Sequence, residues 1–578
     1  MDQGRKRRRP LVLLLLLSAS GALLIAGWKT FWFLTDDAFI SFRYVSNSML
    51  GHGYVWNAPP FHPVEGYTSF LWVALLDGVW RALGIAPPAA ANYVSLLFAF
   101  LTLLVVAWMV TGMRLGGRSR PYRSAFLGLV LLGIVTNRTF LTWSSSGLET
   151  AMFNFFVLLW LGVCIRVRPD SRWFGPLLGT SAALIYLTRP DGVLFVLATL
   201  VILALAAGRR PLGPGAGQPG EQPGWLRGRW FAGLLPLLAL PAHLVWRLAT
   251  YGEWLPNSYY AKVTGPWPGS GVRYAASFVL EYGIWLWVLL LLAVGGKALW
   301  SRWGPPRDSL VTGNGDGGAY GETALHPWRS NVAIPAVTLA VHGLYYTFIV
   351  GGDHFEYRVY SHLIPLAFIT FFWMLNRLDF RRSLSIALLV AFVLLSLPVG
   401  WTHWALTRNL QTREQTHNLF APIAGHWPGP LRWYARAFDS QQAWLTAHYV
   451  CTRHQEHKIN CEFLRSVFPS REEGAALPDA GYPVFAFGAV GVVSWVMPEV
   501  NIIDTHGIND YVIARSPVEP GTFRMMGHDR MAPDGYVECF RPNVEIMRGR
   551  RLVVHPRKEP LTPEEIIECE SRWIQSVR

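Results

Sequence analysis

Long runs of apolar residues recur along the first 400 residues of the chain, and they constrain its fold more than any other feature. A helix that crosses the ~30 Å hydrocarbon core of a bilayer needs about 20 mostly apolar residues. Eleven segments approach this description, at 11–32, 91–113, 124–140, 149–165, 173–188, 191–208, 230–250, 275–299, 331–350, 360–376 and 383–400. The sequence therefore predicts a polytopic α-helical membrane protein with about eleven transmembrane helices.

The composition agrees with a membrane protein and also indicates a polar part. Only 15% of the 578 residues are charged, against about 25% in soluble globular proteins, and 27 residues are Trp. Trp and Tyr gather at membrane–water boundaries. These values exclude a soluble enzyme and a disordered chain. A mean hydropathy of +0.26 is low for a chain made only of spans, so a sizeable polar part must be attached.

The basic residues indicate the orientation of the chain. Cytoplasmic loops of membrane proteins are enriched in Lys and Arg. If segment 67–83 is a helix on the outer surface and not a span, 23 basic residues fall on one side of the membrane and nine on the other before residue 400. This asymmetry predicts a cytoplasmic N-terminus and an outward tail. It accounts for the net charge of +14 without nucleic-acid binding.

The tail from about residue 401 to 578 is long enough for one domain, and residues 1–400 form the transmembrane domain. Segment 442–468 predicts a helix, whereas 484–496 and 501–504 predict strands, so the tail is expected to be an α/β domain outside the membrane. Four cysteines in an oxidising compartment are expected to form two disulfides. Proximity in sequence favours the pairs Cys451–Cys461 and Cys539–Cys569, and the paired C-x-x-C spacing of a zinc site is absent.

Six polar segments interrupt the apolar pattern, and the predicted topology places all six on the outer side. Ionisable residues at membrane depth are costly, and they mark functional sites. The segments carry Asp36 and Asp37, Glu65 and Tyr67, Glu149, Arg189 and Asp191, Asn257 to Lys262, and Asp353 to Arg358. The sequence therefore predicts a site that opens outward.

Each of these groups has two interpretations. Asp36 and Asp37 are adjacent carboxylates, which repel each other and raise the pKa of one, as suits a general base; they could also cap the helix that follows. Lys262 and Arg358 could bind a phosphate or lie as rim charges. Arg189 and Asp191 could form an internal ion pair, and Glu65 and Glu149 could be helix-start carboxylates.

Taken in order, these segments resemble the GT-C family of polyprenyl-phosphate-sugar glycosyltransferases, and most closely the terminal β-arabinofuranosyltransferases of actinobacterial cell walls. The resemblance rests on segments 36–40 (DDAFI), 63–65 (PVE), 146–150 (SGLET), 189–191 (RPD), 256–262 (PNSYYAK), 351–358 (GGDHFEYR), 503–508 (IDTHGI) and 527–537 (GHDRMAPDGYV). It covers residues 35–540, and its departures, such as Asp191 and Thr150, leave the sugar open.

The resemblance implies a GT-C-like fold with helices on the outer surface, in the cytoplasmic membrane of a bacterium. It implies transfer of a sugar, arabinofuranose in the closest family, from a polyprenyl-phosphate donor to an envelope glycan or glycolipid. We expect Asp36 or Asp37 to be the base, with Asp36 favoured because it lies nearer the membrane-embedded donor. The residues expected to bind donor or substrate are Arg43, Glu65, Tyr67, Glu149, Arg189, Asp191, Asn257, Tyr259, Tyr260, Lys262, Asp353, His354, Arg358 and His528.

The resemblance implies no certain cofactor, and a divalent metal held by Glu149, Asp353 and His354 is an alternative use of those side chains. A transporter or flippase of lipid-linked sugars is the main alternative function. Transporters place charged residues near the bilayer midplane, often in repeated halves. Here the charges lie at the ends of spans on one side, which favours the transferase. An inactive scaffold would lack Asp36 or Asp37.

Overall fold

The computed structural model describes residues 2–116, 119–207, 231–303, 330–412, 424–426, 428–477, 481–547 and 551–577, so the segments 209–229 and 304–329 lie outside it. The first part of the chain is helical, with α1 (Asp2–Thr30), α2 (Asp36–Met49), α3 (Phe70–Leu83), α4 (Pro87–Thr111), α5 (Arg123–Val135), α6 (Arg138–Thr142), α7 (Thr150–Arg166), α8 (Phe174–Thr188), α9 (Val193–Ala207), α11 (Ala239–Tyr251), α12 (Asn257–Lys262), α13 (Pro268–Glu281), α14 (Ile284–Trp303), α15 (Ser330–Leu344), α16 (Leu363–Leu378), α17 (Arg382–Leu395) and α18 (Pro398–Thr407).

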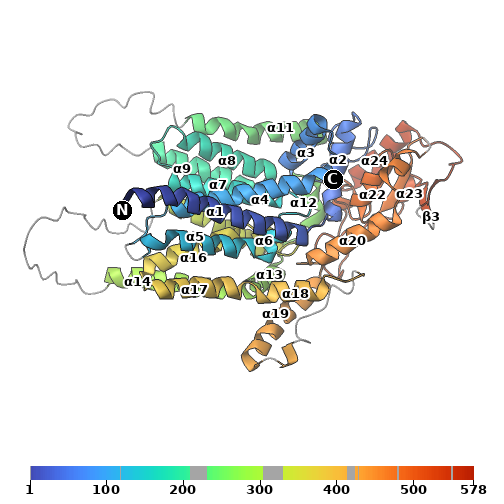
Figure 1. Cartoon of the computed structure of the whole chain (residues 1–578). Helices are drawn as coiled ribbons and strands as arrows, with labels where there is room; N and C mark the ends of the chain where they lie inside the picture. Colours follow the sequence, from blue (N-terminus) through green and yellow to red (C-terminus); the bar gives the residue numbers. More distant parts are fainter. Residues whose placement is uncertain are drawn as a thin grey trace, which may run out of the picture.

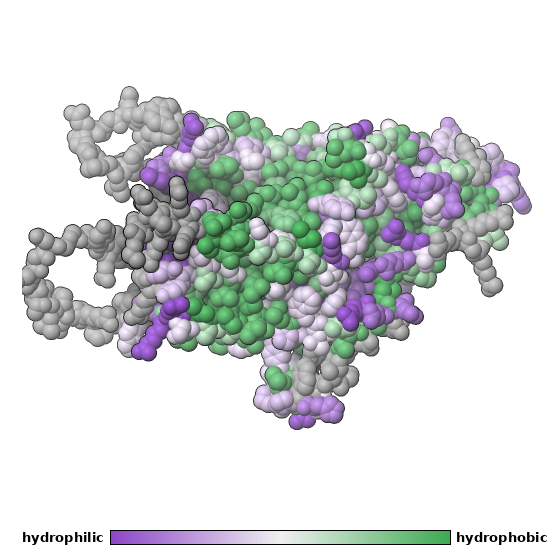
Figure 2. Space-filling view, viewed as in Figure 1, coloured by the Kyte–Doolittle hydropathy of each residue, from purple (hydrophilic) through white to green (hydrophobic). Residues whose placement is uncertain are grey.

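The long apolar helices run side by side as a bundle (Figure 1). The N-terminus lies at one end of the bundle, and the C-terminal segments cover the other end. Apolar side chains form a broad belt on the flank of the bundle, and hydrophilic residues gather toward the end that carries the C-terminal segments (Figure 2). Such a belt between polar ends is the surface that a bilayer-spanning bundle presents to lipid.

Among the described residues, seven helical stretches are long and apolar enough to cross a membrane: Pro10–Thr30, Pro87–Thr111, Pro190–Ala207, Phe231–Tyr251, Val332–Val350, Arg358–Leu378 and Arg382–Thr407. The predicted span 275–299 is a pair of helices, α13 and α14, bent by 91°. Those at 149–165 and 173–188 are the shorter apolar helices α7 and α8. The predicted span 124–140 is broken after Val135, where α5 ends.

Segment 67–83, expected to lie on the surface, forms helix α3 over Phe70–Leu83. Its 14 residues rise about 21 Å, which is less than the ~30 Å hydrocarbon core. Asp77 in this helix forms an ion pair with Arg81, one turn away, and accepts a hydrogen bond from Tyr54. A charged pair on a short helix is typical of a position at the membrane surface.

The tail combines helices with two small sheets. Its helices are α19 (Gly429–Ala447), α20 (His454–Val467), α21 (Arg471–Ala475), α22 (Val490–Val496), α23 (Tyr536–Cys539) and α24 (Pro563–Val577). Strand β1 (Val484–Phe487) pairs in parallel with β2 (Asn501–Asp504), and β3 (Val544–Met547) pairs antiparallel with β4 (Arg551–Val554). The strand expected at 501–504 is therefore confirmed.

The strand expected over 484–496 is wrong in its second half, because the chain turns after Phe487 and forms helix α22. Its valines favour a strand by local propensity, but burial against α2 decides the local structure. The helix expected over 442–468 is likewise two helices, α19 and α20, with a break between them. Tyr449 and Cys451 in that break have positive φ angles of 56° and 58°, which no continuous helix allows.

Helix α2 holds both ends of α22. The Asp36 carboxylate accepts hydrogen bonds from the backbone N–H groups of Gly491 and Val492, at 3.1 and 2.7 Å. Seven residues later on α2, Arg43 donates to carbonyls at the other end of α22 and just beyond it, those of Ser494, Met497, Pro498 and Val500. Each charge therefore meets the helix end of opposite partial charge.

Hydrophobic packing continues from the bundle into the tail. Buried residues of α22, including Val492 and Val493, belong to the same apolar core as α2 and the bundle helices. A smaller core around Val484, Tyr536 and Phe540 serves the outer part of the tail. The tail is thus packed on the bundle and is not tethered as a separate body.

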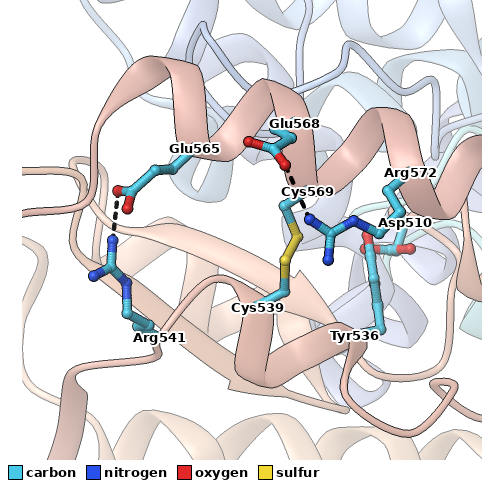
Figure 3. The surroundings of a disulfide bond; sticks show 8 residues. All are labelled: Asp510, Tyr536, Cys539, Arg541, Glu565, Glu568, Cys569 and Arg572. Atoms are coloured by element: carbon cyan, nitrogen blue, oxygen red, sulfur yellow. Dashed lines mark hydrogen bonds and ion pairs between the residues drawn. A yellow bond between two sulfur atoms is a disulfide. The ribbon is translucent and has the colours of Figure 1, made fainter.

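One of the two expected disulfides is present. Cys539 on α23 and Cys569 on α24 are joined, close to the Tyr536–Asp510 hydrogen bond and the Arg541–Glu565 ion pair (Figure 3). The expected pair Cys451–Cys461 is wrong, because both residues are buried free thiols. The Cys451 sulfur accepts a hydrogen bond from Gln442. Cys461 lies on α20, where burial and the charge of Asp36 both raise the pKa of its thiol.

We predict that Arg43→Met destabilises the protein by at least about 3 kcal/mol, because several buried carbonyls lose their donor and each unsatisfied group costs about 1–3 kcal/mol. The apparent unfolding temperature of the purified protein, followed by light scattering and fluorescence, measures the change. Arg81→Met is the matched control, since Arg81 is half exposed and pairs at the surface. Equal unfolding temperatures for the two variants would contradict the role given to Arg43.

Candidate functional site

The aspartate pair is positioned by a crossing of two loops. Backbone hydrogen bonds join Thr35 N to the Ser146 carbonyl and Ser146 N to the Phe33 carbonyl, both at 3.1 Å. Ser146 and Gly147 have positive φ angles, and a Cβ at Gly147 would lie 2.7 Å from the Cβ of Ala38. A glycine is therefore required where the start of α2 passes this loop.

The two aspartates have different surroundings. Asp36 is buried and bound to two backbone amides of α22, as described above. Burial raises the pKa of Asp36 to about 7, against the lowering effect of those amides, and the charge of Asp37 raises it further. Asp37 is half buried, and the described structure gives its carboxylate no hydrogen bond or ion pair. Asp37 is therefore the carboxylate that a ligand can reach.

Three histidines form a cluster, and one of them, His354, lies near enough to Asp37 to be affected by its charge. The ring centroids of His354 and His528 are 5.6 Å apart, and those of His528 and His506 are 4.7 Å apart. His354 Nδ1 lies 2.8 Å from the Tyr449 carbonyl and His528 Nδ1 lies 2.8 Å from the Met526 carbonyl, so each Nδ1 carries the proton and each Nε2 is an acceptor.

Burial favours the neutral form of two of these rings, those of His354 and His528. Burial lowers the pKa of His354, and the negative charge of Asp37 opposes that shift while the positive charge of Lys262 adds to it. Burial also lowers the pKa of His528 to about 3, helped by the neighbouring histidines and by Lys262. The charge of Lys262 therefore acts on both His354 and His528, and the charge of Asp37 acts on His354.

Lys262 is the cation that faces this cluster. Its side chain passes Gly527, where a Cβ would lie 3.5 Å from the Lys262 Cε. No ion pair in the described part of the chain involves Lys262, so its charge is available to an anionic ligand.

Two arginines lie behind the cluster, and both are engaged by carboxylates. Arg358 binds Asp353 through two hydrogen bonds of 2.8 and 3.3 Å, with its guanidinium 4.4 Å from the Phe355 ring centroid. Arg189 contacts Asp191 at 3.3 Å and Glu149 at 3.6 Å. These pairs orient the guanidinium groups, and they also offset their charge.

A buried ion network holds the loop that carries Asp353, His354 and Arg358. Glu356 in this loop contacts Arg138 of α6 and, at 3.2 Å, Arg453 from the tail. Glu281 of α13 completes the network, 2.8 Å from Arg453. Burial alone would raise the pKa of Glu356, but the charges of the two arginines hold it below its usual range. The tail therefore helps to position the site.

Several residues expected at the site support the structure around it. Arg43 binds only backbone carbonyls, so its substrate-binding assignment is replaced by a structural one. Glu65 forms a buried pair with Arg247 at 2.5 Å, and Tyr67 contacts the Tyr251 hydroxyl. Asn257 donates to tail carbonyls, among them that of Gly507, at 2.9 Å.

The remaining expected residues divide between exposed and engaged positions. Tyr259 is 41% exposed, whereas Tyr260 donates to Glu253 and lies under the Arg515 guanidinium. Asp191 also accepts hydrogen bonds from Tyr346 and His342, which ties it to α15. The prediction did not include His506 in the site, although its IDTHGI segment was noted, because a single histidine in a loop carries little signal.

The side chains do not form an obvious metal centre. Within the described ranges there is no group of three or more His, Cys, Asp and Glu side chains that could hold a metal ion. Two donors of the proposed set are also engaged by cations, since Asp353 binds Arg358 and Glu149 contacts Arg189. The described residues therefore do not fit a divalent cation.

Fold and site together define a helical membrane protein whose carboxylates, cations and histidines converge at one end of the bundle. The sequence matches no family model. It is 26% identical, over 371 residues, to the terminal β-(1→2)-arabinofuranosyltransferase of Corynebacterium glutamicum, covering 59% of this chain and 47% of that protein. The chain thus spans about half the length of this curated relative. The resemblance predicted from the motifs is confirmed by this relative.

Among solved structures, the chain is similar to the oligosaccharyltransferase of Archaeoglobus fulgidus in its apo form. The TM-score is 0.41 at 12% sequence identity, covering 85% of this chain and 64% of that one.

We predict a pH dependence of stability from Asp36. Its folded pKa of about 7 exceeds the ordinary 3.8, so folding takes up a proton between these values, and the free energy of unfolding falls as pH rises from about 4 to about 7. Asp36→Asn should flatten this part of the curve. Apparent unfolding temperatures across this pH range measure the slope.

Asp170→Asn is the control, because Asp170 is an exposed carboxylate in a surface pair. It should leave the slope of the wild type unchanged. An Asp36→Asn curve parallel to the wild-type curve would contradict the burial of a titrating carboxyl group at this position.

Proposed function

We propose that the protein is a membrane glycosyltransferase that moves a sugar, arabinofuranose by analogy with its relative, from a polyprenyl-phosphate donor to a hydroxyl group of an envelope glycan or glycolipid. The observation that carries the proposal is that the two neighbouring aspartates have different surroundings. One carboxylate is sequestered by α22, and the other is left open near His354, whose pKa the charge of Asp37 raises and the charge of Lys262 lowers. A base next to an unpaired cation suits transfer from a phosphosugar.

The proposed reaction moves one proton and one glycosyl group. The acceptor oxygen forms a bond to C1 of the sugar, and the bond from C1 to the phosphate oxygen breaks with its electron pair left on the phosphate. The acceptor proton passes to the carboxylate of Asp37. Lys262 offsets the charge that develops on the leaving phosphate.

Asp37 replaces Asp36 as the favoured base. A general base must approach the hydroxyl group to within hydrogen-bond distance. Both oxygens of Asp36 accept backbone hydrogen bonds, and its carboxyl group is buried, whereas Asp37 is half buried with no such partner among the described residues. We assign Asp36 to holding α22 and the start of α2.

The histidines and arginines have supporting roles in this proposal. The neutral Nε2 atoms of His354 and His528 accept hydrogen bonds from sugar hydroxyl groups. Arg358 and Arg189 are already paired with carboxylates, so they assist the phosphate only by exchanging partners. Lys262 is therefore the main phosphate ligand, and Arg358 the second.

The proposed location is the cytoplasmic membrane of a bacterium, with the N-terminus in the cytoplasm and the tail outside. The support is the excess of basic residues in the segments that the predicted topology places in the cytoplasm. A polyprenyl-phosphate donor in the outer leaflet would then meet the site at the level of the headgroups. The bilayer and the acceptor glycan are the partners that this arrangement requires.

A transporter or flippase of lipid-linked sugars is the competing function. Transporters bind substrate near the bilayer midplane, on discontinuous helices. The open carboxylate, the free lysine and the histidines gather instead next to the tail, which favours chemistry at one face. If the purified protein moves the donor across the membrane of a vesicle and transfers no sugar, that result would favour the transporter function.

We predict that Asp37→Asn lowers the rate of sugar transfer by about 10²–10⁴-fold, because it removes the base while preserving size and polarity. Purified protein in nanodiscs, supplied with a synthetic polyprenyl-phosphate arabinofuranose and an oligoarabinofuranoside, provides the assay. Asp36→Asn should mainly lower the apparent unfolding temperature. The molecules that remain folded should lose much less of the transfer rate than Asp37→Asn does. The mechanism is wrong if Asp37→Asn turns over at the wild-type rate.

We predict that Lys262→Ala lowers the turnover rate by about 10²-fold, as expected for the loss of one group that stabilises developing charge. Arg358→Lys should have a smaller effect, because the charge stays while the paired geometry with Asp353 is lost. Lys458→Ala, on the exposed side of α20, is the matched control and should be neutral. Full activity of Lys262→Ala would make Lys262 a rim charge.

A further inference from the structure

A platform of aromatic rings lies on the surface beside the site. Trp444 and His448, one turn apart on α19 and its end, stack with centroids 3.9 Å apart and an interplanar angle of 17°. His448 contacts Phe523 at 4.4 Å and Trp267 at 5.9 Å. Phe523 is 56% exposed, and the other three rings are partly exposed. We call these four residues the aromatic platform.

Two arginines border the aromatic platform. The Arg524 guanidinium lies 4.3 Å from the Trp267 ring centroid, and that of Arg273 lies 5.0 Å from the Trp444 ring centroid. Arg524 is held by the carbonyls of Gly265 and Pro266. The surface therefore combines partly exposed aromatic rings, among which Phe523 is the most exposed, with N–H donors.

The aromatic platform and the site are built from the same three segments. Lys262 and Trp267 are five residues apart, as are Phe523 and His528. His448 is followed by Tyr449, whose carbonyl binds His354. The Met526 N–H donates to the His448 carbonyl at 3.0 Å, which ties two of the segments together. A ligand that leaves the site along these segments therefore meets the rings.

We propose that the aromatic platform binds the acceptor glycan beyond the sugar that reacts. A sugar ring offers a flat face of C–H groups, which packs on aromatic rings, and hydroxyl groups, which accept from guanidinium N–H groups. An acyl chain would not use the arginines, and a free phosphate would not use the rings. The inference rests on the proposed function, because it extends the acceptor side of that site.

The aromatic platform has the extent of a subsite for one or two sugars beyond the one that reacts. Its four rings form a continuous series from Trp267 to the exposed Phe523, whereas the donor presents a single sugar. Long acceptors should therefore gain affinity from the platform, and short ones should not.

The test compares a short and a long oligoarabinofuranoside as acceptors for the full-length protein in nanodiscs. Trp444→Ala and Phe523→Ala should raise KM for the long acceptor by about 5- to 10-fold, in line with the loss of one aromatic contact, and leave KM for the short acceptor and the donor unchanged. Trp444→Phe and Phe523→Tyr should restore most of the affinity. Trp433→Ala is the control on the same helix, since Trp433 is 68% exposed outside the platform.

Saturation-transfer NMR of the same proteins with a panel of furanose and pyranose oligosaccharides measures binding without turnover. Binding by the wild type that Trp444→Ala and Phe523→Ala weaken supports the aromatic platform, even if the wild type transfers no sugar and the proposed function fails. The inference is overturned if both variants keep the wild-type KM for the long acceptor. It is also overturned if the wild type binds no oligosaccharide of the panel.

Discussion

The attachment of α22 to α2 is the interaction on which the rest of the structure depends. Asp36 and Arg43 lie seven residues apart, about two helical turns, so they project from one face of α2 and meet opposite ends of a seven-residue helix. Each charge faces the helix end of opposite partial charge. The tail is thereby fixed over the bundle, where it contributes His506 and His528 to the site.

Opposite charges also order the second side of the site. Arg138, Glu281, Glu356 and Arg453 come from four separate parts of the chain and form one buried network. A buried charge is tolerated only where partners satisfy it, so these residues specify one arrangement of the loop that carries His354 and Arg358. Lys262 and Asp37 have no such partners among the described residues, and they are the two charges that the proposed function assigns to the ligand.

The proposed role of the aromatic platform concerns which acceptor glycan the site selects. Small sites that act on polymers need a surface that recognises the chain beyond the reacting group, and remote binding energy then serves to orient the reacting group. Three segments of the chain carry both kinds of residue here. In the proposed function, acceptor recognition and chemistry would therefore be coupled through these short segments.

The sequence by itself determined the class of protein, because the apolar runs, the basic loops and the six polar segments follow directly from the cost of placing charge in hydrocarbon. Sequence spacing also found the Cys539–Cys569 pair and strand β2. Only the tertiary structure decided that 490–496 is helical, that Cys451 and Cys461 stay apart, and that Asp36 serves the fold while Asp37 stays open. The first and the last of these outcomes depend on contacts between α2 and α22, more than 400 positions apart, which burial and helix-end charges select and which local sequence does not encode.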